Sequence, residues 1–437
     1  MSLPRRLMTS RAVVLTVLIA SLAIFIAACA KNPVTGQDEL VLMSERQELA
    51  MGAKYYPQVI QLNHGLPPQD SSLQSYVTSV GNRLAAVSHR PRVPWQFAVV
   101  NSSQVNAFAL PGGKISITRG LITKMNSEDE LAGVLGHEIG HVTARHGVAG
   151  YTRQVLLTGA LLGLALALGD NEYAPVALAA AGVAGNLMML SYSRDQERQA
   201  DQLGYAYMTR AGYNPTATVR TFELFKRMQK SEPGEIENML SSHPLPRERI
   251  EAARQRALRS ANAGQPFKTA RFRRALARQK KRAPAYAAAD KGNALAQKKR
   301  WSQATAYYQR AISLYTGEGM FYSRLALAQN ELGQKRAAAA NARKGAKLSG
   351  YNFYPSFILG MVERKNRNYR ASLKAHQRAY RVMPQHVINN FYLAYAFDRT
   401  GDRRRAATAY RLVYKAAPKS NYGRASYKRL GQLGALK

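Results

Sequence analysis

The chain contains a single cysteine among its 437 residues, and this scarcity excludes a fold held together by disulfide bonds within the chain. Beyond the first 28 residues it also lacks any apolar run of the roughly 20 residues that comfortably cross a bilayer. Acidic residues are scarce too, with 26 Asp and Glu against 63 Lys and Arg. Hydrophobic residues are not scarce: at 46% they can fill the cores of two or three domains, so the chain is not disordered overall.

The one cysteine, Cys29, follows a segment typical of a secretory signal peptide. Residues 1–28 combine a basic start with a short apolar core, and they end in Ile26-Ala27-Ala28 directly before the cysteine. This ending resembles a bacterial lipobox, which predicts that Cys29 is lipidated and becomes the N-terminus of the mature chain. Ala30 rather than Asp follows Cys29, and by resemblance to lipoprotein sorting signals this implies the outer membrane. The alternative is an uncleaved anchor helix with an incidental cysteine.

The shortage of acidic residues leaves a formal charge of +37. Such a charge usually suggests nucleic acid as the partner, but the sequence shows no nucleic-acid-binding signature. An exported lipoprotein meets anionic lipid head groups and lipopolysaccharide instead. General basicity in an organism with an acidic periplasm would give the same composition, and both explanations stay open at this point.

Residues 43–118 show the pattern of helices followed by a small sheet. We expect helices over 43–53 and 73–87, a strand over 95–101, and a hairpin of strands 107–110 and 114–118 around Pro111-Gly112-Gly113. A strand placed just before the next helix commonly forms the rim of a cleft, where its free edge could pair with an extended substrate backbone. An ordinary buried hairpin is the alternative.

The next helix carries the sequence His137-Glu138-Ile139-Gly140-His141, an HExxH motif. Ser127 and Glu130 form a capping-box pattern at its start, and Gly147 is expected to end it. Histidines four residues apart lie on one helix face and can bind the same ion, which favours zinc, and Glu138 beside them is the expected catalytic base. The pattern therefore predicts a zinc hydrolase, and a third ligand is needed to complete the site.

Two apolar stretches, 155–168 and 176–190, follow this helix, and each is shorter than a comfortable bilayer span. We expect a helical hairpin that packs over or beside the cleft and can touch the membrane; two transmembrane helices are the alternative. A further helix opens near Ser193 and stops at Gly212. Its Glu197 and Asp201 share one face, and by themselves they fit a solvated face as well as a ligand pair.

Together these motifs resemble the zinc metallopeptidases that include HtpX and the CAAX prenyl proteases, and among them the BepA-like periplasmic lipoproteins with C-terminal tetratricopeptide repeats. The resemblance runs from about residue 32 to residue 254 and continues into the repeats. An ordered set of short stretches carries it: Asn32-Pro33-Val34-Thr35-Gly36, Asn106-Ala107-Phe108-Ala109, Pro111-Gly112-Gly113, the HExxH motif, Glu197 with Asp201, and Ser242-His243-Pro244 with Arg249.

The resemblance implies that His137, His141 and Glu197 bind zinc, that Glu138 is the base, and that Asp201 supports a ligand histidine. It also implies that His243 lies on a loop that can cap the metal and hold the enzyme closed. A structural role for His243 beside Pro244 is the alternative. The implied fold class is mainly α, a gluzincin-type protease domain with a small sheet at its rim, followed by an α-solenoid.

The solenoid is visible in the sequence as a 34-residue period. Leu325, Leu359 and Leu393 are in phase, and small residues recur at the same spacing, as expected of about four tetratricopeptide repeats. A stretch without acidic residues, 252–289, precedes the repeats and is expected to be a solvated basic linker or a contact for anionic head groups or an acidic partner.

We therefore expect a signal peptide over 1–28, a lipid anchor and tether over 29–55, a protease domain over 56–256, a basic linker over 257–284 and repeats over 285–437. The expected function is that of a zinc endopeptidase, lipid-anchored in the periplasm at the outer membrane and acting in quality control or assembly of outer-membrane proteins. Its expected partners are protein substrates and, through the repeats, the barrel-assembly machinery; nucleic acid is not expected. The alternative is an adaptor or chaperone that acts through its repeats while its protease is restrained.

Overall fold

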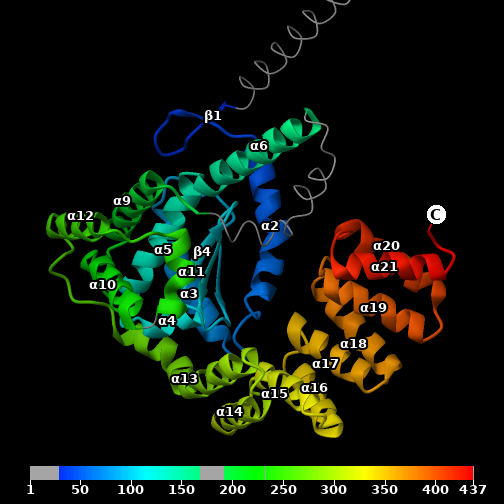
Figure 1. The fold of residues 1–437 in the computed structure, drawn as a ribbon. Helices are drawn as coiled ribbons and strands as arrows, with labels where there is room; N and C mark the ends of the chain where they lie inside the picture. The colour runs from blue at the N-terminus through cyan, green and yellow to red at the C-terminus, as the bar shows by residue number, and fades with distance from the viewer. Residues whose placement is uncertain (1–28, 168–190, 232, 437) are drawn as a thin grey trace, which may run out of the picture.

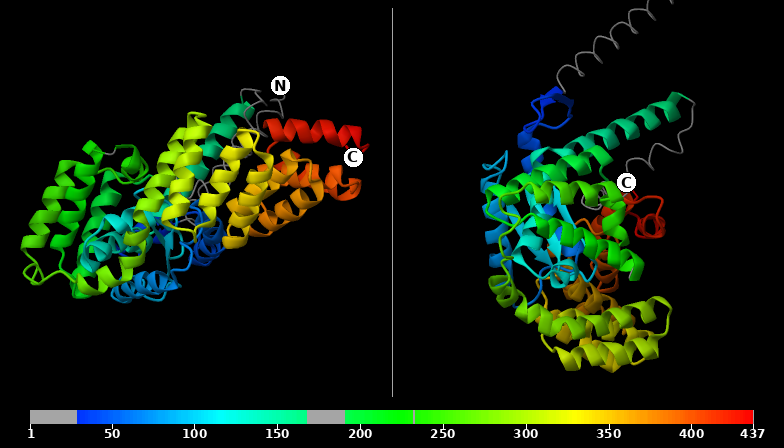
Figure 2. Two further views of the ribbon diagram at one scale, coloured as in Figure 1. Left: turned by 90° about the horizontal axis from the view of Figure 1, so that it is seen from below. Right: turned by 90° about the vertical axis from the view of Figure 1, so that its left-hand side faces the viewer.

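The computed structural model describes residues 29–167, 191–231 and 233–436 of the chain (Figure 1). A part built from helices and a small sheet is followed by a curved row of helix pairs, which confirms the mainly α fold class (Figures 1 and 2). The predicted signal peptide lies outside the described residues.

The N-terminal part extends to residue 258. Its strands are β1 (Cys29–Lys31), β2 (Asp38–Leu40), β3 (Gln96–Val100), β4 (Ala107–Leu110) and β5 (Lys114–Thr118). Its helices are α2 (Glu45–Leu62), α3 (Ser71–Ala86), α4 (Arg119–Lys124), α5 (Glu128–Thr143), α6 (His146–Ala167), α9 (Arg194–Arg210), α10 (Thr216–Ser231), α11 (Pro233–Ser242) and α12 (Arg247–Leu258).

The larger sheet has the order β3-β5-β4, with β3 parallel and β4 antiparallel to β5. Ala107 pairs with Ile117 and Leu110 with Lys114, so the predicted hairpin is confirmed. Its turn needs Gly112 and Gly113, because both have a φ of 75°, which side chains rarely tolerate. Helix α3 packs on β3 and helix α5 on β4, and β4 forms one edge of this sheet.

Helix α5 carries the HExxH motif, and its start confirms the predicted cap in part. The Ser127 side chain accepts a hydrogen bond from the backbone N–H of Glu130, whereas the Glu130 carboxylate accepts from Asn126 rather than from Ser127. The predicted end at Gly147 is wrong. The helix ends at Thr143, and Arg145 with a φ of 55° makes the break, so Gly147 already belongs to α6.

Residues 29–55, predicted as a tether, are largely folded onto this part. Helix α2 crosses the predicted boundary at residue 55, and its Glu48 is 1% exposed. The Glu48 carboxylate binds the guanidinium groups of Arg90 at 2.9 Å and Arg145 at 2.9 Å, and it accepts from the backbone N–H of Gly112 at 3.2 Å. One buried carboxylate thus connects α2, the hairpin turn and the segment after α5. Removing one partner of such a buried network typically costs about 3 to 5 kcal/mol.

The basic segment before the repeats differs from the predicted solvated linker. From Ala270 it forms α13 (Ala270–Gln297), which buries Phe272 and Leu276 in the core of the N-terminal part. The guanidinium groups of Arg278 and Arg282 donate to backbone carbonyls of residues 68–69, at 3.2 and 3.0 Å. These two basic side chains form hydrogen bonds with the carbonyl oxygens of a loop, and the apolar side chains are buried in the core. The segment is therefore a helix packed on the N-terminal part, not a solvated linker.

The repeats follow as α14 (Trp301–Leu314), α15 (Gly319–Glu331), α16 (Lys335–Leu348), α17 (Phe353–Lys365), α18 (Tyr369–Val382), α19 (Val387–Arg399), α20 (Arg403–Ala416) and α21 (Asn421–Gln432). Helices α15, α17, α19 and α21 each begin 34 residues after the previous one, which confirms the predicted period. Small residues stand where paired helices cross. A Cβ atom at Gly360, for example, would lie 2.6 Å from the imidazole of His376.

The repeats are attached to the loop between β3 and β4, to the start of α4 and to the end of α2. Asn101 donates from its side chain to Glu318 at 2.8 Å, and the guanidinium of Arg119 lies 3.5 Å from the ring centre of Tyr286. The backbone N–H of Phe353 donates to the side chain of Gln61 at 2.9 Å. These contacts join segments far apart in the sequence and fasten the solenoid beside the sheet (Figure 1).

Within the described ranges, no helix combines the length and the apolar character required to span a bilayer. The predicted apolar hairpin begins inside α6, where Val155, Leu156 and Leu157 are exposed. The rest of that hairpin, residues 168–190, lies outside the described residues.

Candidate metal centre

Helices α5 and α9 approach each other so closely that even a Cβ atom would be crowded at the glycines between their backbones. A Cβ atom at Gly204 would lie 2.9 Å from the backbone nitrogen of His137, and one at Gly140 would lie 3.0 Å from the carbonyl oxygen of Ala200. This contact places Glu197 of α9 opposite the two histidines of α5. The small residues of the two helices are therefore the local reason why a carboxylate distant in sequence reaches the HExxH motif.

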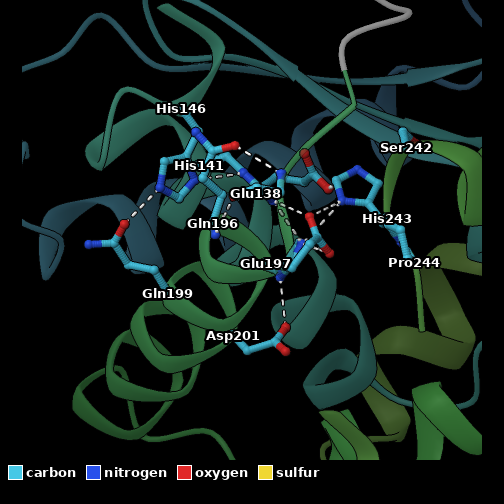
Figure 3. A network of polar contacts seen from close by, with 12 residues as sticks. Glu138, His141, His146, Gln196, Glu197, Gln199, Asp201, Ser242, His243 and Pro244 are labelled. Carbon is cyan, nitrogen blue, oxygen red and sulfur yellow. Dashed lines mark hydrogen bonds and ion pairs between the residues drawn. The ribbon is translucent and has the colours of Figure 1, made fainter. Parts of the chain in front are cut away.

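Four side chains converge where these helices meet. The ligand atoms of His137, His141, Glu197 and His243 all lie within 4.8 Å of one another. Figure 3 shows His141, Glu197 and His243 side by side in this cluster. The Nε2 atoms of His137 and His141 are 3.0 Å apart, and Glu197 Oε1 lies 3.1 Å from His141 Nε2. The structure thus brings together the three predicted ligands and the predicted capping histidine.

The orientation of His137 is set by Asp201. The Nδ1 atom of His137 lies 3.0 Å from Asp201 Oδ1, which turns Nε2 toward the cluster. Asp201 is bound in turn by Arg249, with two hydrogen bonds of 2.8 Å, and Arg249 also donates to Glu197. Burial by itself would raise the pKa of the Asp201 carboxyl, but its hydrogen bonds to His137 and Arg249 lower it, so it stays a carboxylate.

The orientation of His141 is set by two residues that the sequence analysis did not single out. His146 Nε2 lies 2.7 Å from the side-chain oxygen of Gln199, so it carries a proton. Burial lowers the pKa of His146 to about 4, which keeps it neutral, so its Nδ1 accepts from His141 Nδ1 at 2.9 Å. His141 therefore directs an unprotonated Nε2 at the cluster. His146 lies five residues after His141, and in a continuous helix this spacing would not bring the two side chains together. The break in the helix at Arg145 lets His146 face the site.

Tyr192 is a second contact that the sequence did not reveal. Its ring stacks on the imidazole of His141 with ring centres 3.8 Å apart, and its backbone N–H donates to Ser242 at 3.4 Å. It therefore covers one side of His141 and connects to the residue before His243. Tyr192 stands between an apolar run and a polar helix start, and no motif in the sequence distinguishes it.

Glu138 is the most isolated polar group of the site. It is 2% exposed, and its Oε2 atom has no hydrogen-bond partner among the described residues. Burial raises the pKa of this carboxyl, although His243 and His137 act in the opposite direction. A carboxyl group with a raised pKa and a free oxygen is suited to accept and return a proton.

His243 follows α11 directly and points into the cluster. Its Nδ1 atom is 2.9 Å from Glu197 Oε1 and 3.3 Å from His137 Nε2, while its Nε2 atom is 3.8 Å from Glu138 Oε1. Burial would lower the pKa of His243, but the neighbouring carboxylates outweigh burial and raise it. His243 thus occupies the space between the expected base and the expected ligands.

The donor set fits a zinc ion. The Nδ1 atoms of His137 and His141 contact Asp201 and His146, which leaves both Nε2 atoms facing the cluster. Glu197 is ionised because His243 and His137 lower its pKa against the effect of burial. Nitrogen ligands from two histidines with one carboxylate are a common catalytic zinc set, which keeps a further position for substrate. A third histidine within reach can take that position.

A pocket beside the cluster is mostly apolar and contains about 630 Å³ of space not filled by protein atoms, part of it open to solvent. Val134, Phe222, Phe225, Met239 and Leu245 are among the residues that line it, together with His137 and Glu138. The charged groups on its wall, Asp201 and Arg249, are already paired with each other. The pocket can therefore accept an apolar side chain next to the expected reaction centre.

Residues 71–257 match the sequence model of peptidase family M48. This confirms the resemblance inferred from the motifs. The matched segment runs from α3 to α12 and contains all four residues of the cluster.

Individual proteins that are similar to this chain are also peptidases. The beta-barrel assembly-enhancing protease of Escherichia coli K12 is 34% identical over 49% of this chain and 45% of its own, and that of Yersinia pestis is 33% identical over 52% and 47%. The mitochondrial metalloendopeptidase OMA1 of Saccharomyces cerevisiae is 27% identical over 51% and 67%. The chain spans about half the length of the first two relatives. A solved tetratricopeptide domain, Arabidopsis OM64, matches 27% of this chain and 98% of its own, at 20% identity and a TM-score of 0.26.

Replacing Asp201 tests how His137 is held. Asp201→Asn should weaken zinc affinity by about 10- to 100-fold, because the residues that orient metal-binding histidines typically contribute that much. Asp195→Asn on the same helix is the control, since its side chain is 86% exposed. A competition titration with a chromogenic chelator measures the difference, and equal zinc affinity in both variants would show that Asp201 does not orient the ligand.

Proposed function

We propose that this chain is a zinc-dependent endopeptidase, with His137, His141 and Glu197 as the zinc ligands and Glu138 as the base. The observation that supports this most directly is the convergence of these side chains at the contact between α5 and α9. The match to peptidase family M48 supports the reaction class. Zinc would supply a Lewis acid that polarises the scissile carbonyl and activates water.

In the proposed mechanism Glu138 moves the proton. Its unpartnered Oε2 atom accepts a proton from the attacking water, and the raised pKa of this buried carboxyl lets it return the proton to the leaving amine. The edge strand β4 begins at Ala107, which lines the apolar pocket. An extended peptide added along this edge would bring one of its side chains to the pocket, so we expect cleavage beside bulky apolar residues.

Glu138→Gln tests the assignment of the base. The variant should retain zinc, because Glu138 is not among the converging ligands, while peptide hydrolysis falls by about 10²- to 10⁴-fold, the usual contribution of a general base. His137→Ala should lose zinc as well as activity. The readouts are bound zinc and cleavage of a quenched peptide with Leu and Phe at its centre. Glu237→Gln, on the exposed side of α11, is the control, and equal rates in Glu138→Gln and wild type would refute the assignment.

The alternative function is that of an adaptor or chaperone whose protease is normally restrained. The position of His243 supports restraint, because its imidazole contacts Glu197 and lies between the ligands and Glu138, where a substrate carbonyl would have to enter. In this state the enzyme would be closed, and movement of the segment after α11 would open it.

His243→Ala tests this restraint. Peptide cleavage should rise several-fold with zinc content unchanged, because the three proposed ligands remain and the entrance is cleared. Ser242→Ala serves as the control for local disturbance. If both zinc content and activity of His243→Ala stay at the wild-type level, His243 has only a structural role.

We further propose that the protein is a periplasmic lipoprotein at the outer membrane, active in quality control or assembly of outer-membrane proteins. The names of the bacterial relatives refer to beta-barrel assembly, which supports this setting for a chain that carries the same peptidase segment. The repeats would contact the assembly machinery or its clients, because a solenoid offers a long continuous surface for protein partners. No nucleic-acid partner is proposed.

Lipidation is tested at Cys29. Mass spectrometry of the mature protein should find acyl chains on an N-terminal Cys29, and Cys29→Ser should prevent processing at this position. A mature chain that starts elsewhere and carries no lipid would contradict the proposed anchor, while leaving the proposed peptidase activity untouched.

A further inference from the structure

The repeat region carries most of the uncompensated charge of the protein. Residues 285–437 contain 29 Lys and Arg against six Asp and Glu. Each of the six acidic side chains has a polar or cationic partner in the structure. These pairs are Asp290 with Asn293, Glu318 with Asn101, Glu331 with Lys365, Glu363 with Arg343, Asp398 with Arg429, and Asp402 with Arg405. The repeats therefore carry more positive charge than their own acidic side chains can neutralise.

Some of these cations border a groove between the last two full helix pairs. Helices α18 and α20 both pack on α19, and between them lies about 1090 Å³ of space not filled by protein atoms, open to solvent. Tyr380, Leu393, Phe397 and Leu412 contribute apolar surface, and Leu412 is 48% exposed. The same groove is lined by Arg381, Arg404 and Arg405, and no carboxylate lines it.

Two of the three arginines are free to bind a ligand. Arg405 is paired with Asp402 and lies over the ring of Phe397 at 4.8 Å. Arg381 and Arg404 are exposed, and neither forms an ion pair with a carboxylate of the described residues. An anionic group in the groove would therefore meet two guanidinium groups without displacing an existing ion pair.

The groove also offers a hydrogen-bond acceptor. Asn390, 8% exposed, lines it and donates from Nδ2 to the backbone oxygen of Pro384 at 2.7 Å. Its Oδ1 atom is buried and has no partner among the described residues. Such an atom can accept from any N–H or O–H donor that reaches it. A peptide backbone supplies an N–H donor at every residue except proline.

The preceding repeat shows that this combination is particular to one place in the solenoid. Thirty-four residues earlier, the positions of Arg381 and Arg404 are again basic, as Lys347 and Arg370. Of the four apolar positions only Leu393 is kept, as Leu359. Ala346 stands for Tyr380, Glu363 for Phe397 and Arg378 for Leu412. The chain thus contains its own reference surface, which keeps these two basic positions but lacks three of the four apolar side chains.

We propose that the groove between α18 and α20 binds an acidic polypeptide segment that carries a bulky apolar side chain. Its carboxylates would pair with Arg381 and Arg404, its apolar side chain would cover Phe397 and Leu412, and a backbone N–H would satisfy Asn390. A flat membrane surface would reach the exposed arginines but not the floor of the groove. Charge complementarity together with the apolar floor therefore selects a peptide over a bilayer.

The test measures binding of a fluorescent peptide that alternates Glu with Leu and Phe, by anisotropy at physiological salt. The full-length protein is used in the Glu138→Gln form so that the probe is not cleaved. The double variant Arg381→Glu/Arg404→Glu should weaken binding about tenfold or more. The matched variant Lys347→Glu/Arg370→Glu should change it less than about twofold, because charges separated by more than about 8 Å are largely screened at this salt concentration.

Leu412→Ser should weaken binding about threefold, because Leu412 is half exposed and its loss leaves the fold intact while removing apolar contact. A peptide with Gln in place of Glu should bind weakly to every form. Equal losses in the two double variants would overturn the proposal in favour of diffuse charge attraction. Vesicles of phosphatidylglycerol that bind in an Arg381- and Arg404-dependent way, with no peptide binding, would overturn it in favour of a lipid surface.

Discussion

The contact between α5 and α9 is the constraint on which the rest of the site depends. Each helix presents glycine or alanine where the backbones meet, and a Cβ at Gly204 would already approach the backbone of His137 to 2.9 Å. The cluster can form only if the two helices are this close, because both carboxylates come from α9. Glu197 contacts His141, and Asp201, one turn later on α9, contacts His137. A larger side chain at this contact would separate the carboxylates from the histidines before affecting any ligand directly.

Around that contact, buried ion pairs fix the positions of the surrounding segments. Glu48 fastens the hairpin turn and the segment after α5, while Arg249 fastens Asp201 and Glu197 from α12. Both networks keep charged groups away from water, which is unfavourable unless every charge has a partner. In return they restrict the positions of the side chains that meet at the cluster, and this restriction is what a metal site requires of its surroundings.

The sequence predicted those features that depend on local spacing. The HExxH histidines, the hairpin around Gly112 and Gly113 and the 34-residue period all follow from helix, turn or repeat geometry, and the structure contains each of them. It did not predict His146 and Tyr192, which reach the site only through the break at Arg145 and through tertiary packing. The basic stretch that forms α13 was predicted as a solvated linker because of its many positive charges. Its burial depends on contacts of Phe272 and Leu276 with a core that is distant in sequence.

Helix α13 has one further consequence. It is a single helix of 28 residues whose first turns bury Phe272 and Leu276 in the N-terminal core and whose later turns pack Tyr286 against Phe321 of the repeats. The two cores are therefore joined by a helix rather than by a loop along this segment, and Pro284 lies inside that helix between the residues that enter the two cores. Because α13 contributes side chains to both cores, a substitution that destabilises one core is expected to lower the stability of the other.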